Sequence, residues 1–244
     1  MDFNAYSSEV LEWLEGVRKN RGTDAEKTLM LCKNIRDYAR EQDDEKLLGY
    51  AYYYSGETYY LLNDVDKLFR NLSCSLPYLE HSRQHGLLAR AYNILAITSM
   101  NRGNAPFAMD YYLNARMYCE KYKLYDIGII ININIGMLYN NFGEYRQAEK
   151  YLEQAYDLLQ KNKEISEYYS YLLNIYIGLG NSCFYQEEYM QAQEYALRAK
   201  EVCSGHLEEL EQIAFACFEA RLCNAMGKKE ECDRNIAIVQ KVSD

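Results

Sequence analysis

The residues of this 244-residue chain that could carry out chemistry show no pattern typical of a reaction site. His81 and His85 have the four-residue spacing of two metal ligands on one helix face, but an expected helix boundary near Ser82 to Gly86 falls between them. No third ligand is evident, and no phosphate-binding glycine loop, nucleophile elbow or paired-acid motif occurs. We therefore expect no metal, no cofactor and no enzyme active site.

The eight cysteines are scattered, and the chain shows no secretion signal at its start. We expect most of them to be small buried apolar residues rather than disulfide partners.

Charge and hydropathy exclude further classes of partner. With 27 basic and 36 acidic residues the net charge is −9, and we find no basic cluster along the sequence, so nucleic acid is a poor partner. No stretch approaches the ~18 continuous apolar residues of a membrane span. A cytoplasmic protein that binds neither nucleic acid nor membrane is expected.

A repeated pattern of small and bulky residues predicts the fold. Two prolines and 13 glycines leave long stretches without a breaker, which favours helix. From Gly136, the residues Tyr139, Gly143, Tyr145, Ala148, Leu152 and Ala155 follow at fixed offsets. The same offsets recur from anchors at 56, 96, 180 and 220, mostly 40 residues apart, and more weakly from 16. Small residues at the anchor and at Ala148 allow two helices to approach closely, and Gly143 suits the turn between them.

Six helix hairpins, or about twelve helices, follow from this repeat. The expected units lie near 4–41, 44–81, 84–121, 124–161, 164–203 and 206–242. Pro106 fits the start of a helix, whereas Pro77 falls inside one and should kink or end it near Leu76.

The repeat resembles the tetratricopeptide repeat (TPR) family, although the family's usual period is about 34 residues. This resemblance implies an all-α fold, a right-handed superhelical α-solenoid, as one domain over 1–244. It also implies a binding function, with peptides or protein segments held on a concave groove formed by the first helix of each pair.

The family's groove positions fall on a set of polar and aromatic residues in this chain. The candidates are Tyr53, Tyr60, Arg90, Asn93, Met137, Asn174, Asn181, Tyr185 and Arg221. The mid-helix asparagines could pair with the main chain of a peptide, and the arginines favour an acidic or C-terminal carboxylate-bearing one. The alternative is that these polar side chains are only solvated and bind no ligand.

Four further asparagines have a structural explanation: Asn101, Asn140, Asn141 and Asn224 should end their helices just before a turn glycine. Among the tyrosines of the run from Tyr50 to Tyr60, we expect Tyr52 and Tyr59 to pack between helices, and Tyr53 and Tyr60 to face the groove.

The stretch from about 45 to 200 also resembles the long-period arrays that precede bacterial diguanylate cyclase (GGDEF) domains, which implies a regulatory or sensory module of a signalling protein. No GGDEF sequence is present. The alternatives are a peptide-pheromone receptor array and, less favoured, an enzyme with a groove active site. At the C-terminus, Cys232, Ile236 and Val239 should point inward, leaving Ile238 and Val242 as an apolar strip for an output domain or a second copy to cover.

Overall fold

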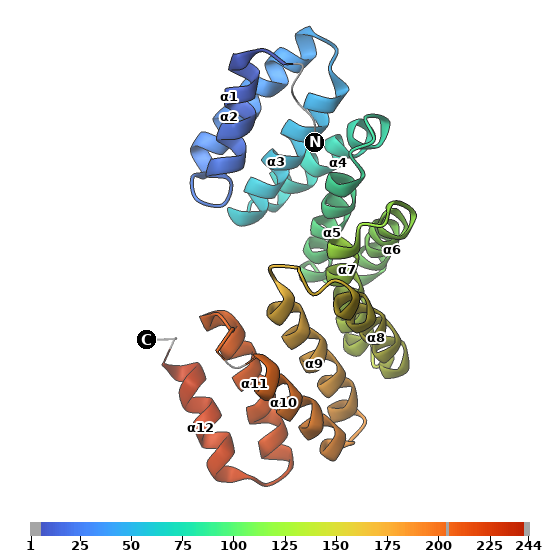
Figure 1. Cartoon of the computed structure of the whole chain (residues 1–244), viewed down its shortest axis with the longest axis vertical. Coiled ribbons are helices and arrows are strands. Elements are labelled where there is room, and N and C mark those ends of the chain that lie inside the picture. The colour runs from blue at the N-terminus through green and yellow to red at the C-terminus, as the bar shows by residue number, and fades with distance from the viewer. Residues whose placement is uncertain (1–5, 204, 242–244) are drawn as a thin grey trace. The chain divides into compact units, whose positions relative to one another are not determined.

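The computed structural model describes residues 6–203 and 205–241, and in this part of the chain all regular structure is helical (Figure 1). Twelve helices are described: α1 (Ser8–Asn20), α2 (Ala25–Glu41), α3 (Glu45–Leu61), α4 (Val65–His81), α5 (His85–Asn101), α6 (Ala105–Tyr122), α7 (Tyr125–Asn141), α8 (Tyr145–Lys161), α9 (Tyr168–Tyr185), α10 (Tyr189–Cys203), α11 (Glu209–Ala225) and α12 (Lys229–Gln240). The predicted all-α repeat array is confirmed. Helices α9 and α11 begin a few residues later than expected, because short turned segments precede them.

The helices form two compact units, and the first three predicted hairpins fall in one and the last three in the other. Unit 1 ends at Leu124 and holds α1 to α6, and unit 2 begins at Tyr125 and holds α7 to α12. Within each unit a helix packs against the other member of its pair. First helices of successive pairs also touch, as α3 touches α5, α7 touches α9, and α9 touches α11.

The turns repeat as regularly as the helices. A left-handed residue with positive φ stands in most of them, at Asp43, Asn63, Arg83, Gly103, Lys123, Gly143, Glu187 and Gly227, with a spacing of 20 residues from Asp43 to Gly143. The next residue stands at the N-cap of α3, α4, α5, α6, α8 and α12, and in α3 and α4 its side chain makes the capping hydrogen bond. The Asp44 carboxylate, for example, accepts a hydrogen bond from the Leu47 amide at 2.9 Å, which satisfies one of the unpaired donors at the start of α3.

Bulky side chains lie directly on the anchor glycines, as the repeat predicts. A Cβ atom added at Gly136 would lie 2.6 Å from Cγ of Leu152, and one added at Gly56 would lie 2.6 Å from Cγ of Leu72. Leu152 also lies against Gly178 of the next first helix, where an added Cβ would be 2.8 Å from its Cδ2 atom. The fully buried Leu152 thus packs against two glycines from two successive pairs.

The fifth pair lacks the bulky side chain that packs on the anchor glycine, and a residue of the sixth pair takes its place. The position that holds Leu152 in the fourth pair holds the small Ala196 in the fifth. A Cβ added at Gly180 would instead meet Phe218 of α11, a fully buried side chain. The volume missing from one repeat is therefore supplied by the next.

The two prolines behave differently. Pro106 lies in the first turn of α6, as expected. Of the two outcomes expected for Pro77, an end of the helix near Leu76 is wrong, because α4 continues to His81, and a kink there stays a prediction. Both Pro77 and Ser73, whose carbonyl loses its helical donor, are exposed, so water can replace the missing hydrogen bond.

Most cysteines are buried free thiols, which confirms the sequence interpretation. Five of the eight are buried, whereas Cys74 and Cys217 are exposed and Cys232 is half-buried. Burial raises the pKa of the Cys32 thiol to about 12, so this group stays protonated and acts as a small apolar side chain.

The last described helix packs only loosely. No residue of α12 is buried, and Ile236, which was expected to point inward, is 41% exposed. Ile238 is 43% exposed, whereas Val242 lies outside the described residues. Ile238 is therefore an exposed apolar residue. That an output domain or a second copy of the chain covers it stays a prediction.

Overpacking at the anchor should destabilise unit 2. Gly136→Leu and Ala148→Leu each place a large side chain where two helices touch, and each should lower the free energy of unfolding by about 1 to 3 kcal/mol or more. Glu153→Gln, an exposed substitution on the same helix as Ala148, is the control. Thermal or urea unfolding measures the effect, and equal stabilities for all three variants would contradict the helix register described above.

Candidate ligand-binding surfaces

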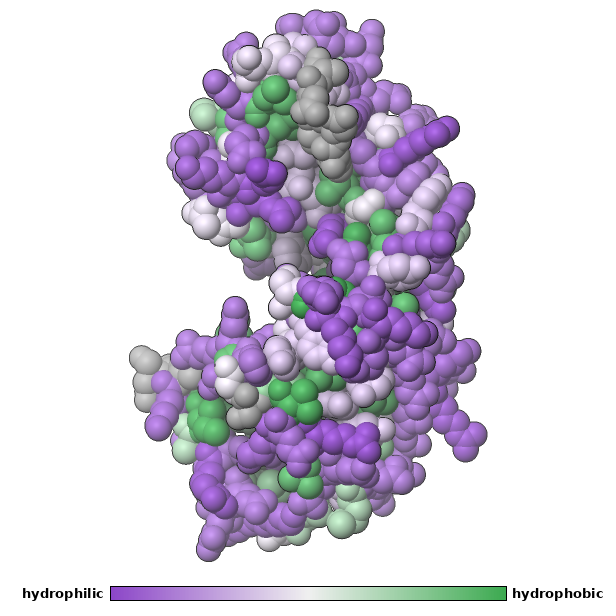
Figure 2. All heavy atoms as spheres, in the orientation of Figure 1, coloured by the Kyte–Doolittle hydropathy of each residue, from purple (hydrophilic) through white to green (hydrophobic). Residues whose placement is uncertain are grey.

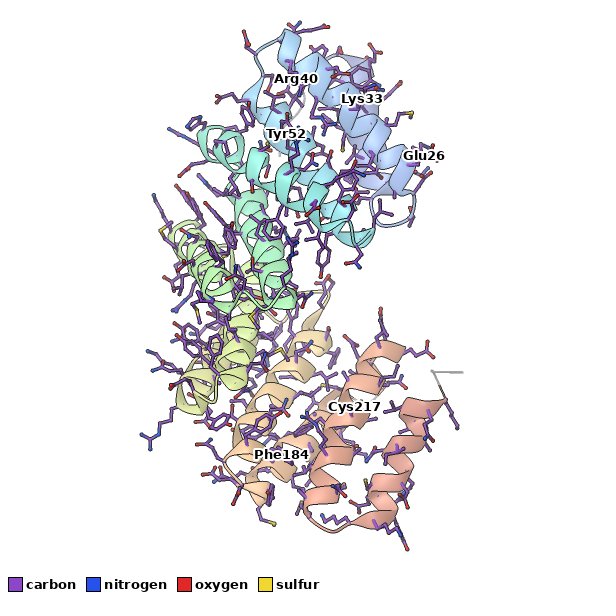
Figure 3. All side chains as sticks on the ribbon, turned by 180° about the vertical axis from the view of Figure 1, so that it is seen from behind. Glu26, Lys33, Arg40, Tyr52, Phe184 and Cys217 are labelled. Carbon is purple, nitrogen blue, oxygen red and sulfur yellow. The ribbon has the colours of Figure 1, made fainter. Side chains whose placement is uncertain are left out.

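In unit 2, three of the predicted groove residues come together on α9 and α11. Arg221 donates from Nη2 to Oδ1 of Asn181 at 2.9 Å and from Nη1 to the hydroxyl of Tyr185 at 3.2 Å. Its guanidinium also lies 5.8 Å from the ring centre of Phe184. We call these four residues the Arg221 cluster; Phe184 is labelled in Figure 3.

The Arg221 cluster presents a positive charge that pairs with no carboxylate of the described residues. All partners of Arg221 are neutral, and both Arg221 and Tyr185 are exposed. The Tyr185 ring is held in place by Tyr145, whose ring stacks on it at 5.8 Å. A fixed guanidinium beside a carboxamide and a hydroxyl can bind a carboxylate of a peptide.

The other two candidates of unit 2 are used differently. The side-chain nitrogen of Asn174 donates to the carbonyl of Ser170 one turn earlier in α9, at 2.9 Å, so part of its hydrogen-bonding capacity is satisfied within the helix. Met137 is half-buried and packs against the hydrophobic core of unit 2. Neither shares a described hydrogen bond with the Arg221 cluster.

Asn140 does more than end its helix, and here the sequence interpretation is wrong. It is buried, donates to the carbonyl of Gly178 at 2.9 Å and accepts from the hydroxyl of Ser182 at 2.8 Å. The side chain therefore joins α7 to α9. Its neighbour Asn141 is exposed, as a helix-ending residue should be.

In unit 1 the expected exposure of Tyr53 is wrong. Tyr53 is 1% exposed and its hydroxyl donates to Oε1 of Glu57 at 3.0 Å. Burial raises the pKa of Tyr53 well above its usual value, and the Glu57 carboxylate adds to the rise, whereas Arg90 opposes it. The ring is covered within unit 1, where α3 packs against α2, α4 and α5.

Tyr60 is exposed at 36%, as predicted, and Arg90 is exposed as well, while Asn93 is half-buried. Tyr52 and Tyr59 are both half-buried, and Tyr52 stacks on Tyr78 of α4 at 6.0 Å.

Two further residues contact the Tyr53–Glu57 pair of unit 1, the exposed Arg21 and the buried Tyr54. Arg21, in the turn after α1, donates to the hydroxyl of Tyr54 at 3.3 Å and lies 3.9 Å from the Glu57 carboxylate. Sequence reasoning missed both Arg21 and Tyr54, because Arg21 lies in a turn rather than at a helical groove position. Tyr54 lies next to Tyr53 in the sequence, and their rings meet edge to face at 4.9 Å.

Within the described residues, no three His, Cys, Asp or Glu side chains are grouped as a metal site would require. His81 ends α4 and faces Glu45, whereas His85 begins α5 and stacks on Tyr122 at 3.5 Å. No helix in this part of the chain combines the length and the apolar character needed to cross a bilayer.

Sequence comparison finds no relative: no protein-family model and no curated protein matches the chain. Solved structures do match. The apo form of RapI superposes with a TM-score of 0.78 at 15% identity, over 96% of this chain and 84% of RapI. NprR in complex with its cognate peptide NprX gives 0.65 at 16% identity, over 99% of this chain and 67% of NprR. A Podosopora anserina kinesin light chain protein with TPR-like repeats gives 0.56 at 14% identity, over 84% of this chain and 95% of that one.

This chain has a TPR-like fold. At these identities the comparison establishes the fold alone, and it agrees with the helix pairs, anchors and turns described above. The likeness to diguanylate cyclase-linked arrays stays a prediction, as does the single domain over 1–244.

The neighbours Asn140 and Asn141 give a matched test of the link between α7 and α9. Asn140→Ala should lower the free energy of unfolding by about 1 to 3 kcal/mol, since it removes two buried hydrogen bonds that join α7 to α9, those to the Ser182 hydroxyl and the Gly178 carbonyl. Asn141→Ala should change it by less than about 0.5 kcal/mol. Urea unfolding followed by circular dichroism measures both, and equal effects would count against the link.

Tyr53 and Tyr60 give a second matched test, because Tyr53 is buried and Tyr60 is exposed. Tyr53→Phe removes a buried hydrogen bond to a carboxylate and should cost about 1.5 kcal/mol or more of stability, whereas Tyr60→Phe should cost almost nothing. If thermal melts rank the two variants in the opposite order, the burial of Tyr53 is incorrect.

Proposed function

We propose that this chain is a binding module that holds a peptide or an exposed protein segment on the surface of its first helices. The observation that carries the proposal is the Arg221 cluster, where an arginine that pairs with no carboxylate in the described part of the chain is fixed between Asn181 and Tyr185. Such a site favours a ligand with a free C-terminal carboxylate or an acidic side chain. Tyr60 and Arg90, two further candidate groove residues, are exposed on unit 1.

A role as a peptide receptor in signalling fits the structural comparison. NprR, which was solved with its cognate peptide, matches 99% of this chain in fold, although this chain spans only 67% of NprR. A peptide-receptor array is therefore the favoured version of the proposal. A regulatory array linked to a diguanylate cyclase is the second version, and the two differ in the output domain and not in the binding surface.

The partner is therefore a peptide or protein segment. The exposed Ile238 of α12 also fits contact with an output domain or a second copy of the chain. The proposal includes no catalytic step and no cofactor, since the first-helix surfaces of the two units offer few titratable groups, mainly Glu57 and tyrosines.

Selection from a random peptide library with free C-termini tests the proposal. The wild-type protein should enrich peptides with an acidic C-terminal region, and Arg221→Ala should weaken their binding about tenfold or more without changing the melting temperature, because its side chain is exposed. Binding is measured by fluorescence anisotropy, and amidation of the selected peptides should have the same effect as the variant.

Arg198→Ala is the matched control. Arg198 is also an exposed arginine of unit 2 but lies on the second helix α10, where it pairs with Glu194, so its loss should leave binding unchanged. If wild type and Arg221→Ala bind the same peptides equally well, the Arg221 cluster is not the binding site.

A further inference from the structure

Unit 1 carries a basic groove on a different face of α3 from the predicted binding surface. It lies between α2, α3 and α4 and has a volume of about 720 Å³. Five cationic side chains line it, namely Lys33, Arg36, Arg40, Lys67 and Arg70, against one carboxylate, Asp37. Figure 3 labels Lys33 and Arg40 along α2, with Tyr52 of α3 beside Arg40. We call it the α2–α4 groove.

This groove corrects the sequence-based statement that no basic cluster exists. The spacing of Lys33, Arg36 and Arg40 places all three on one face of α2, but the other cations come from α4 and join them only through packing. The local positive charge contrasts with the net charge of −9 for the chain.

Arg36 is held in position by neutral groups alone. Its Nη1 atom donates to the Ser55 hydroxyl at 2.9 Å and to Oδ1 of Asn71 at 3.4 Å, and its guanidinium lies 5.2 Å from the ring centre of Tyr52. The Nε and Nη2 donors have no hydrogen-bond partner among the described residues. A half-buried, fixed guanidinium with spare donors and no counterion is suited to bind an anionic oxygen.

Lys33 and Arg70 add two charges that are free to meet a ligand. Both are exposed, and neither makes an ion pair or hydrogen bond with the described residues. Arg40 and Lys67 are partly engaged, since Arg40 donates to the Tyr52 hydroxyl at 3.0 Å and lies 3.7 Å from Asp37, and Lys67 lies 2.8 Å from Asp64.

The next groove along the second helices shows that this charge is not a general property of the repeat. It lies between α4, α5 and α6, has a volume of about 390 Å³ and is lined by Phe69, Phe107 and Tyr111 with the single cation Arg102. The excess of cations therefore belongs to the α2–α4 groove in particular.

The aromatic rings of the groove indicate which kind of anion it takes. Nucleic acid would need exposed ring faces on which bases could stack. The Tyr52 ring is stacked on Tyr78 and also lies near the guanidinium of Arg36, and the Tyr59 ring has the Lys67 amine 5.2 Å from its centre. With the rings occupied in this way, the cations are left to bind carboxylates, and a chain with net charge −9 repels a long polyanion.

We propose that the α2–α4 groove binds an acidic peptide segment of a protein partner, with carboxylates at Arg36, Lys33 and Arg70. This is a second binding site, separate from the Arg221 cluster of unit 2. The groove residues of α2 run from Leu29 to Arg40, a rise of ~17 Å along the helix, which about five extended residues of a bound peptide would span.

The test uses a fluorescent peptide of about eight residues, acetylated and amidated, in which glutamate alternates with alanine. Fluorescence anisotropy should show binding that weakens as salt rises, because the charges lie close to solvent. Lys33→Glu/Arg70→Glu should reduce the affinity at least about tenfold, since it replaces attraction by repulsion. The same peptide with glutamine in place of glutamate should not bind.

Lys19→Glu/Lys27→Glu is the matched control, because it changes the net charge equally at exposed positions of unit 1 outside the groove. An equal loss of affinity in this control would show unspecific attraction and overturn the proposal. So would an absence of binding by the wild type, or tighter binding of a single-stranded oligothymidine in the groove. The Arg221→Ala variant should bind the acidic probe normally, so this proposal and the proposed function can fail independently.

Discussion

The packing of a bulky side chain onto a glycine backbone sets the distance between the two helices of a pair. Leu72 lies on Gly56 and Leu152 lies on Gly136, and in both cases the methyl groups occupy the space that a Cβ atom would need. Because this contact fixes the rotation of the first helix about its axis, it also decides which side chains reach the surface. The buried position of Tyr53, three residues before Gly56, follows from the same geometry.

Polar contacts between successive pairs join residues that are about 40 positions apart in the sequence. Tyr118 donates to Glu80 and the side chain of Gln84 donates to the Lys46 carbonyl, each across 38 residues, and Arg221 donates to Asn181 across 40. These separations are close to one repeat, so equivalent positions of neighbouring pairs meet in space. A polar residue at such a position can either join two repeats or bind a ligand. A buried side chain is suited to the first use and an exposed one to the second.

The sequence was sufficient to predict the helices because every unit repeats the same small and bulky positions. It was less informative about single side chains. Asn140 and Asn141 look alike beside a turn glycine, yet only the packing of α9 against α7 shows that one of them is buried. The α2–α4 groove was missed for a related reason, since Arg36 and Arg70 are far apart in the chain and are brought together by helix packing.

The absence of buried residues in α12 has a consequence for motion in unit 2. A helix of 12 residues is marginal in water unless packing stabilises it, and α12 rests on α11 alone among its strong contacts. Its backbone amides should therefore open through local unfolding far more often than those of α7 or α9, which are largely buried. Hydrogen exchange would then record a gradient of protection that falls from the centre of the unit toward Gln240, so this end of the array can change its contacts without disturbing the surface that holds Arg221.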